Sequence, residues 1–283
     1  MKTRLITFAL LGATLLCSAD FALAQSWTKH EIQFFAHRGS RFEFDENTLD
    51  AFRQSYAAGV RGFETDFRLN KDGNIILNHD ASLYRTCGVD VQVEELTDAQ
   101  CRKVRTLEGH QLTFAEDLLE FFADKEGLYV EFEIKTSKEM YTQAKLDELC
   151  DKAYKLVMSH RHPSSQYFFT SFDKRALTTM QRLHPDAPLI ILINKPCSTE
   201  VLMEAYDMGI MRVGCRIEGT TRKAVDLGHK LGMFISLWPG QCKEDFMLGV
   251  SLGADALCCD CFVEVSSWAK EAMPFVKLKG VAR

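Results

Sequence analysis

The chain has 283 residues, of which 46% are hydrophobic and 26% are charged. This composition is typical of a folded domain, and it excludes a disordered chain, a collagen-like chain and a protein with several membrane spans. The formal net charge is −5, and the Lys and Arg residues are interspersed with Asp and Glu along the whole chain. A nucleic-acid binder would need a basic stripe, so we expect no nucleic-acid partner.

The first residues have the pattern of a secretory signal. Two basic residues precede an apolar run over residues 5–16, and Ala22-Leu23-Ala24 supplies small residues at the spacing that signal peptidase reads. We therefore expect a signal peptide over residues 1–24, a single mature domain over residues 25–283, and export to a periplasm or to the extracellular space. The apolar run is shorter than the roughly 20 residues that span a bilayer and no later stretch is longer, so we expect no stable membrane insertion.

Ten cysteines are present, and removal of the signal would take away Cys17 and leave an odd number. At least one thiol of the mature chain is then free or bonded to another chain, and the sequence does not give the connectivity. Acylation of Cys17 in a lipoprotein is disfavoured by the bulky Leu16 before it. The run Cys258-Cys259-x-Cys261 has no second Cys/His pair at zinc-site spacing, which argues against a structural zinc site.

In chain order, short apolar runs alternate with longer amphipathic ones. The runs typical of strands cover residues 33–36, 62–69, 128–134, 166–171, 189–193, 212–215, 233–237 and 256–259. The stretches typical of helices cover residues 47–58, 113–122, 138–159, 174–183, 198–208, 220–231, 244–252 and 263–270. One helix per strand predicts an α/β fold, and we prefer a closed (β/α)8 TIM barrel to a doubly wound open sheet, which would give a similar alternation. Residues 74–110 break this alternation after the second strand and predict a small insertion at the end of the barrel where active sites are built.

Two carboxylates lie close together in the second predicted strand. Glu64 and Asp66 are two residues apart, so both side chains project to the same face. Two like charges inside a barrel are costly unless a cation joins them. A divalent cation, Ca²⁺ or Mg²⁺, is the simplest partner because both prefer oxygen ligands. The alternative is that one of the carboxylates forms an ion pair with Arg61, Arg68 or Lys135.

Further polar residues follow other predicted strands. Glu133 repeats the alternation in the third strand and is a candidate third ligand, and Lys135 lies two residues on, where it could meet a substrate anion. His37 and His79 each follow an apolar run. They suggest an acid and a base, because the pKa of imidazole is about 6.5 and the ring can play either part. Arg38 offers a fork of donors that suits a pair of phosphate oxygens. Together these groups would suit phosphoryl transfer.

The sequence resembles the glycerophosphodiester phosphodiesterase family. The motifs that carry the resemblance run through nearly the whole mature chain in order: His37-Arg38-Gly39, Glu46-Asn47-Thr48, Glu64-Thr65-Asp66, Asp72-Gly73, His79-Asp80, Leu83-Tyr84-Arg85-Thr86, Leu112-Thr113-Phe114-Ala115-Glu116, Glu133-Ile134-Lys135, Ser171-Phe172, Trp238 and Cys259-Asp260. The resemblance implies a (β/α)8 barrel that uses one divalent cation to hydrolyse a small glycerophosphodiester to glycerol 3-phosphate and an alcohol.

The resemblance also implies a role for each matching residue. By motif position, the acid/base pair is His37 and His79, the metal ligands are Glu64, Asp66 and Glu133, the phosphate contacts are Arg38 and Lys135, and Trp238 walls the substrate pocket. The family mechanism allows either water or the glycerol 2-hydroxyl to attack first, the latter through a cyclic phosphate, and the sequence does not choose between them. Asp45, Pro239 and Phe262 depart from the family pattern on loops around the barrel mouth, which leaves the alcohol specificity open.

Two other functions stay open at this point. A phospholipase D-like or phosphoinositide-cleaving barrel enzyme would also use two histidines and a cation, and a membrane substrate would favour exposed aromatic and basic residues near the mouth. An inactive secreted binding protein is expected to lack at least one ligand or histidine, and none is missing here. The sequence does not give the cation or the oligomeric state.

Overall fold

The computed structural model describes residues 31–282. The predicted signal peptide, its cleavage after Ala24 and the start of the mature domain at residue 25 therefore lie outside the described residues. In the part that is described, no helix is both long and apolar enough to cross a membrane.

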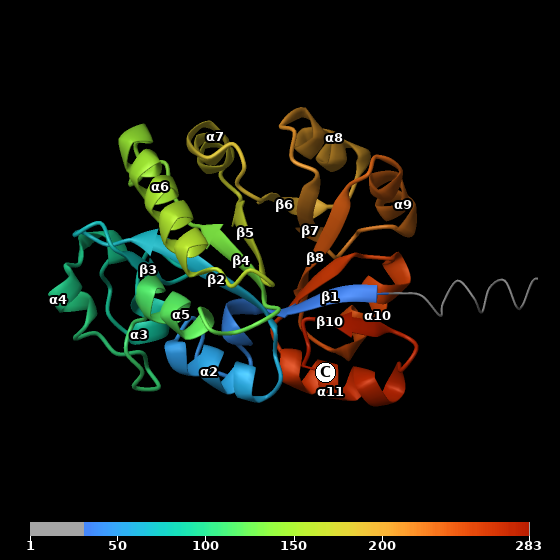
Figure 1. Ribbon diagram of the computed structural model, residues 1–283, viewed down its shortest axis with the longest axis horizontal. Helices are drawn as coiled ribbons and strands as arrows, with labels where there is room; N and C mark the ends of the chain where they lie inside the picture. The colour runs from blue at the N-terminus through green and yellow to red at the C-terminus, as the bar shows by residue number, and fades with distance from the viewer. Residues whose placement is uncertain (1–30, 283) are drawn as a thin grey trace, which may run out of the picture.

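The fold is a closed parallel barrel, as predicted. Its eight strands are β1 (Glu31–Ala36), β2 (Gly62–Leu69), β4 (Tyr129–Ile134), β5 (Gln166–Ser171), β6 (Leu189–Pro196), β7 (Arg212–Arg216), β8 (Phe234–Gly240) and β9 (Ala256–Cys259). Each strand pairs in parallel with the next, and β1 closes the barrel by pairing with both β9 and β2. All eight predicted strands are present, so the doubly wound alternative is wrong (Figure 1).

Helices cover the outside of the barrel, one after each strand (Figure 1). They are α2 (Leu49–Ala57), α5 (Ala115–Phe122), α6 (Gln143–His160), α7 (Lys174–Leu183), α8 (Thr199–Asp207), α9 (Arg222–Lys230), α10 (Lys243–Leu252) and α11 (Phe262–Ala272). Helix α6 begins five residues later than the predicted 138–159, because the Thr142 side chain accepts a hydrogen bond from the Lys145 N–H and caps the helix there.

Strand alternation decides which side chains face the helices and which face the barrel interior. On β1, Phe34 points outward and stacks on Phe262 of α11 with ring centroids 4.4 Å apart, whereas Phe35 points inward and packs near Tyr129. On β2, Phe63 packs outward against α2 and α5, and Glu64 therefore faces inward. Burial of the aromatic outer residues thus holds the carboxylates inside the barrel.

The insertion is more regular than the sequence suggested. It contains β3 (Ile75–Leu77), which pairs antiparallel with β2, and the short helices α3 (Tyr84–Cys87), η2 (Val93–Glu95) and α4 (Asp98–Cys101). Its apolar residues form a small core of their own, which includes Ile76, Leu83, Val93 and Phe114. The insertion is therefore a packed unit that presents the residues after β3 to the barrel mouth.

The C-terminal segment adds a strand that the sequence pattern did not predict. β10 (Lys277–Lys279) pairs in parallel with the first half of β1, and the Gly280 carbonyl accepts hydrogen bonds from the Arg61 and Gly62 N–H groups. This segment closes the gap between β1 and β2 at the amino end of the barrel, where the two strands pair only through Ala36 and Phe63. All nine cysteines of the described chain are free thiols.

Candidate active site

The predicted site residues gather at the carboxyl ends of β1, β2 and β4. His37 follows β1 directly in η1 (His37–Gly39), a tight turn in which Arg38 has φ 53°. The Arg38 N–H donates to Glu64 Oε2 at 3.1 Å, so this strained turn is fixed by a carboxylate of the next strand. Asn47 donates from Nδ2 to Asp66 Oδ2 at 2.8 Å and thereby ties the following loop to the same cluster.

Three carboxylates form the centre of the site. Asp66 lies opposite Glu133 in the pairing of β2 with β4, and one oxygen each of Glu64, Asp66 and Glu133 lies within 4.8 Å of the other two. All three side chains are buried. Glu64 Oε1 and Asp66 Oδ1 are buried and accept no hydrogen bond. Three oxygen donors with two unpaired atoms fit a Ca²⁺ or Mg²⁺ ion.

Two basic side chains lie against the carboxylate cluster. Lys135 Nζ lies 2.7 Å from Glu133 Oε1 and 3.4 Å from Asp66 Oδ1, and Arg38 Nε lies 3.4 Å from Asp66 Oδ2. The ion pair that the sequence offered as the alternative is therefore present for Lys135. It is absent among the described residues for Arg61, which donates to backbone carbonyls, and for Arg68, which pairs with Glu94.

Burial shifts the pKa values of the three carboxyls in different directions. Burial raises the pKa of Glu64 well above its usual range, and the charges of Asp66 and Glu133 raise it further. Burial also raises the pKa of Glu133. Burial acts in the same sense on Asp66, but the Lys135 and Arg38 charges outweigh it and hold the pKa of Asp66 below its usual range. Burial therefore favours a proton on Glu64 or Glu133, and a divalent cation would offset this by adding positive charge beside the three carboxylates.

His37 is oriented by a carboxylate from the far end of the chain. Its Nδ1 lies 2.5 Å from Oδ1 of Asp260, which directly follows β9 and is fully buried. Asp260 also accepts from Arg41 Nη2 at 2.8 Å and from Gln241 Nε2 at 3.0 Å. The free His37 Nε2 lies 3.7 Å from Glu64 Oε2. Burial lowers the pKa of His37, so its imidazole is held neutral with one nitrogen aimed at the carboxylates.

His79 lies across the mouth in the loop after β3. The backbone is fixed by Arg68, which donates from Nε and Nη2 to the His79 carbonyl, and the ring Nδ1 lies 2.6 Å from Asp80 Oδ1. Asp80 in turn accepts from Arg85 Nε at 2.6 Å. Burial lowers the pKa of His79 to about 4. Like His37, this histidine is neutral at physiological pH and has its Nδ1 bound to a carboxylate.

Arg85 links the insertion to the loop that follows β1. Arg85 of α3 donates to both oxygens of Glu46, from Nη1 and Nη2 at 2.7 Å each, and Glu46 also accepts from Arg38 Nη1 at 3.0 Å. A continuous chain of charged groups therefore connects His79 of the insertion to Arg38 of the first barrel loop.

A hollow of about 270 Å³ lies at the barrel mouth. Its lining includes His37, His79, Glu64 and Glu133, and its wall is aromatic, because Trp238 of β8 meets Phe172 edge to face at 5.4 Å. A second hollow of about 670 Å³ meets the first at His79 and Glu133 and is lined by Lys135. A larger hollow of about 1050 Å³ lies at the opposite end of the barrel and contains none of the predicted residues.

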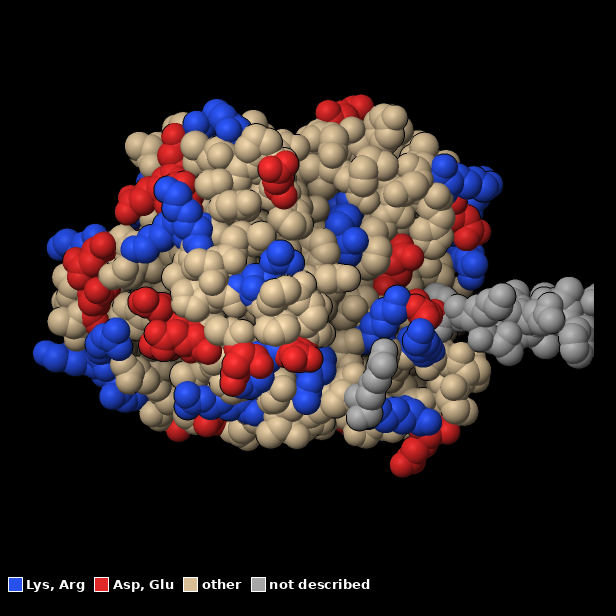
Figure 2. Space-filling view, viewed as in Figure 1, with Lys and Arg blue, Asp and Glu red and all other residues tan. Residues whose placement is uncertain are grey.

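All eight predicted residues thus lie at one end of the barrel. Reasoning from the sequence missed the contributions of Asp260, Asp80, Arg85 and Glu46, which lie in matched motifs but received no role. Asp260 could have been found from its position, because it directly follows the last predicted strand, where site residues of a barrel lie. On the face in Figure 2, basic and acidic side chains are mixed and no basic stripe is present.

Comparison with known proteins decides the family. A model of the Glycerophosphoryl diester phosphodiesterase family matches residues 37–263. The chain belongs to this family. The chain is 24% identical over 236 residues to a glycerophosphodiester phosphodiesterase of Caldanaerobacter subterraneus subsp. tengcongensis, with 80% of this chain and 92% of that protein covered. It is 28% identical over 239 residues to a glycerophosphodiester phosphodiesterase of Bacillus altitudinis, with 81% and 94% covered.

Solved structures of this glycerophosphoryl diester phosphodiesterase family have the same fold. A phosphodiesterase of Oleispira antarctica, in complex with the product sn-glycerol-3-phosphate, superposes with a TM-score of 0.77 at 18% identity, covering 84% of this chain and 97% of that one. A structure from Silicibacter pomeroyi gives a TM-score of 0.75 at 22% identity, covering 82% of this chain and 91% of that one. The resemblance drawn from the motifs and the (β/α)8 prediction are both confirmed.

Proposed function

We propose that this protein is a divalent-cation-dependent phosphodiesterase that hydrolyses glycerophosphodiesters to glycerol 3-phosphate and an alcohol. One observation carries this proposal. His37 and His79 line the same hollow as Glu64 and Glu133 of the carboxylate cluster. General acid/base groups beside a cation site are what cleavage of a phosphodiester requires.

Glu64, Asp66 and Glu133 would hold the cation, Ca²⁺ or Mg²⁺. When bound, the cation polarises the phosphoryl oxygens and offsets the negative charge that develops on them. Arg38 and Lys135 lie against the same carboxylates, so a cation that took over these oxygens would free both basic groups to bind the phosphate.

The histidines carry the protons. Because Asp260 and Asp80 each bind an Nδ1, the Nε2 atom of each ring is left to exchange a proton with the substrate. One histidine, neutral, takes a proton on its Nε2 from the attacking oxygen. The other, which must enter the step protonated on both ring nitrogens, gives its Nε2 proton to the departing alcohol. The same two histidines would serve whether water or the glycerol 2-hydroxyl attacks first. If the 2-hydroxyl attacks first, the histidines exchange roles between the two steps.

The size of the hollow supports a small substrate. Its volume of about 270 Å³ lies below the roughly 300–1,000 Å³ of pockets for drug-sized ligands, which suits glycerol phosphate. Trp238 and Phe172 would provide an apolar wall for the glycerol carbons. The product that the Oleispira relative binds has this size and charge.

The predicted signal at residues 1–24 adds a proposal about location. We propose that the enzyme is exported and acts in a periplasm or outside the cell. Fractionation of cells that produce the full chain would test this: a processed form beginning near residue 25 outside the cytoplasm is expected, and an unprocessed cytoplasmic form would contradict it.

The reaction itself is tested with purified mature protein and three substrates: glycerophosphocholine, glycerophosphoethanolamine and glycerophosphoinositol, each with Mg²⁺, Ca²⁺ or EDTA. A coupled dehydrogenase measures the glycerol 3-phosphate released. We expect product with a cation and none with EDTA, and we expect His37→Ala to lower kcat by at least ~10²-fold. The matched control is His229→Ala, since His229 pairs with Asp255 far from the site at the amino end of the barrel.

Two results would overturn the proposal. Release of the alcohol from lysophospholipids but not from these diesters would favour the phospholipase D-like alternative. No product from folded protein with any diester or cation would favour the inactive binding protein.

A further inference from the structure

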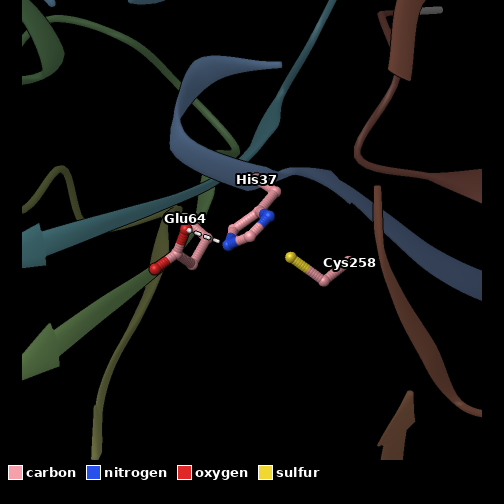
Figure 3. A group of neighbouring side chains, drawn as sticks. All are labelled: His37, Glu64 and Cys258. Carbon is pink, nitrogen blue, oxygen red and sulfur yellow. Dashed lines mark ion pairs between the residues drawn. The ribbon is translucent and has the colours of Figure 1, made fainter. Parts of the chain in front are cut away.

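A thiol lies beside the first histidine in the barrel mouth. Cys258 is the third residue of β9 and pairs in register with Phe35 of β1, so its side chain faces the barrel interior. Its Sγ, a ring nitrogen of His37 and an oxygen of Glu64 lie within 4.8 Å of one another. Figure 3 shows the Cys258 sulfur and the Glu64 carboxylate both pointing toward the His37 ring.

These three side chains differ in chemistry from the carboxylate cluster. Glu64, Asp66 and Glu133 offer only oxygen, which suits Ca²⁺ or Mg²⁺, whereas imidazole and thiolate are ligands that Zn²⁺ prefers. One Cys, one His and one carboxylate, with a fourth position open, is a ligand set of the kind found in zinc sites with three protein ligands. No role in phosphodiester cleavage has been given to Cys258.

The surroundings of His37 already match those of a zinc ligand. Histidines that bind metals nearly always donate their other ring N–H to a carboxylate or carbonyl, and Asp260 accepts from His37 Nδ1 in this way. The free Nε2 lies 3.7 Å from Glu64 Oε2. Two ligands that each lie ~2.0–2.1 Å from a tetrahedral zinc ion are about 3.4 Å apart, so only a small movement is needed.

The site also has an unsatisfied buried atom. Glu64 Oε1 accepts no hydrogen bond. Cys258 is 7% exposed and Glu64 is 5% exposed, so both are shielded from bulk water but border the hollow at the barrel mouth. An ion can therefore reach them through the same opening as the substrate.

We propose that His37, Glu64 and Cys258 form a binding site for a thiophilic divalent cation such as Zn²⁺, and that occupation of this site blocks catalysis. On binding, the Cys258 thiol loses its proton to solvent and the thiolate, the imidazole Nε2 and one Glu64 oxygen bond to the ion. Since Glu64 belongs to both ligand sets, this site competes with the carboxylate cluster for the cation. The inhibition rests on the proposed role of His37 in proton transfer, whereas the binding does not.

The test uses the mature chain, with Co²⁺ as a spectroscopic stand-in for Zn²⁺. Absorption spectra during Co²⁺ titration report whether sulfur is a ligand, through a sulfur-to-cobalt charge-transfer band, and Zn²⁺ competition gives the zinc affinity. The variants are Cys258→Ala and the matched control Cys150→Ala, whose thiol is also buried but lies in α6 outside the barrel. Thermal melting without added metal checks that each variant is folded.

We expect the charge-transfer band in the wild type and in Cys150→Ala, and its loss in Cys258→Ala. Zinc affinity should fall in Cys258→Ala by at least ~10²-fold, the upper end of what is lost when a group that only orients a metal ligand is removed. A variant that keeps the thiol, Asp260→Asn, should retain the band and lower zinc affinity by ~10–100-fold. This second variant tests His37 as a ligand independently of Cys258→Ala, and an unchanged zinc affinity in Asp260→Asn would count against the site.

A band that persists unchanged in Cys258→Ala, or a wild-type protein without a band, would overturn the inference.

The Mg²⁺- or Ca²⁺-supported rate is measured in parallel, with each variant normalised to its own rate without zinc. Zinc should inhibit the wild type and Cys150→Ala, and Cys258→Ala should resist. An absence of turnover in every sample would contradict the proposed function, while the cobalt spectra would still decide the metal site.

Discussion

Replacement of Asp260 by Asn should disable His37 without removing it. Asp260 accepts from His37 Nδ1 on one side and from Arg41 and Gln241 on the other. An asparagine keeps one acceptor oxygen, and the two donors on the far side compete for it. The amide NH₂ then faces Nδ1 of the histidine, which stabilises the tautomer that carries its proton on Nε2. That tautomer cannot accept a proton from the substrate side.

Two known effects bound the expected fall in kcat of Asp260→Asn. Groups that orient a reacting or ligating side chain typically contribute ~10–100-fold, and the whole acid/base contribution of a histidine is ~10²–10⁴-fold. Asp260 is fully buried, so bulk water does not reach its carboxylate. We therefore expect kcat to fall by about 10²-fold, which corresponds to about 2.7 kcal/mol in the activation free energy. KM should change less, because Asp260 does not line the hollow.

The assay is a double-mutant cycle on kcat with saturating cation and glycerophosphodiester. Asp260→Asn, His37→Ala and the double variant are compared with the wild type at a temperature where all four are folded. If Asp260 acts through His37, the double variant should be no slower than His37→Ala alone. If kcat of the double variant is about 10²-fold lower than that of His37→Ala, the reasoning is refuted. It is also refuted if kcat of Asp260→Asn lies within twofold (about 0.4 kcal/mol) of the wild-type value.

Three further outcomes follow from the site. Burial raises the pKa of Glu131 to about 7, so the folded state keeps a proton that the unfolded chain loses near its ordinary pKa of about 4.3. Wild-type stability should therefore fall relative to Glu131→Gln by up to about 3 kcal/mol between about pH 4.5 and pH 7; urea unfolding of both proteins at about pH 5 and pH 8 measures this, and parallel curves would contradict it. Arg85→Gln should lower kcat by about 10-fold through the loosened carboxylate partner of His79, while this partly exposed ion pair changes the unfolding free energy by less than about 1 kcal/mol; an unchanged kcat would show that His79 is positioned without it. A cation at about 100 times its Kd should stabilise the wild type by about 2.7 kcal/mol, and EDTA or Glu133→Gln should abolish that gain in thermal melting; equal stabilisation of Glu133→Gln would place the cation elsewhere.

Local patterns in the sequence predicted the eight strands and the helices between them, but an open sheet would have given a similar alternation. The alternation of apolar runs with amphipathic ones reflects the periods of strand and helix, which depend on neighbouring residues only. The same period placed Glu64 and Asp66 on one face, because residues two apart on a strand always share a face. The boundaries that differ, such as the later start of α6, depend on a cap formed by a single side chain, Thr142.

Other features depend on contacts that no local pattern reports. The Asn74-to-His110 segment has weak periodicity, yet it folds because its few apolar residues meet each other and β2 pairs with β3. β10 is three residues long and forms only because β1 and β2 diverge at the amino end of the barrel.

The sequence by itself determined the strand-and-helix units, the family resemblance and the residues that could hold a cation and move protons, because strand period and short motifs are local properties of a chain. Pairing of β1 with both β9 and β2 decided that the units close into a barrel. Only the tertiary structure decided how those residues are supported. Asp260 binds a histidine 223 positions away, and Cys258 lies beside the same ring, because closure of the barrel brings β9 against β1. Partners that meet through closure have no fixed spacing along the chain, so their contacts are decided by the fold and not by the order of residues.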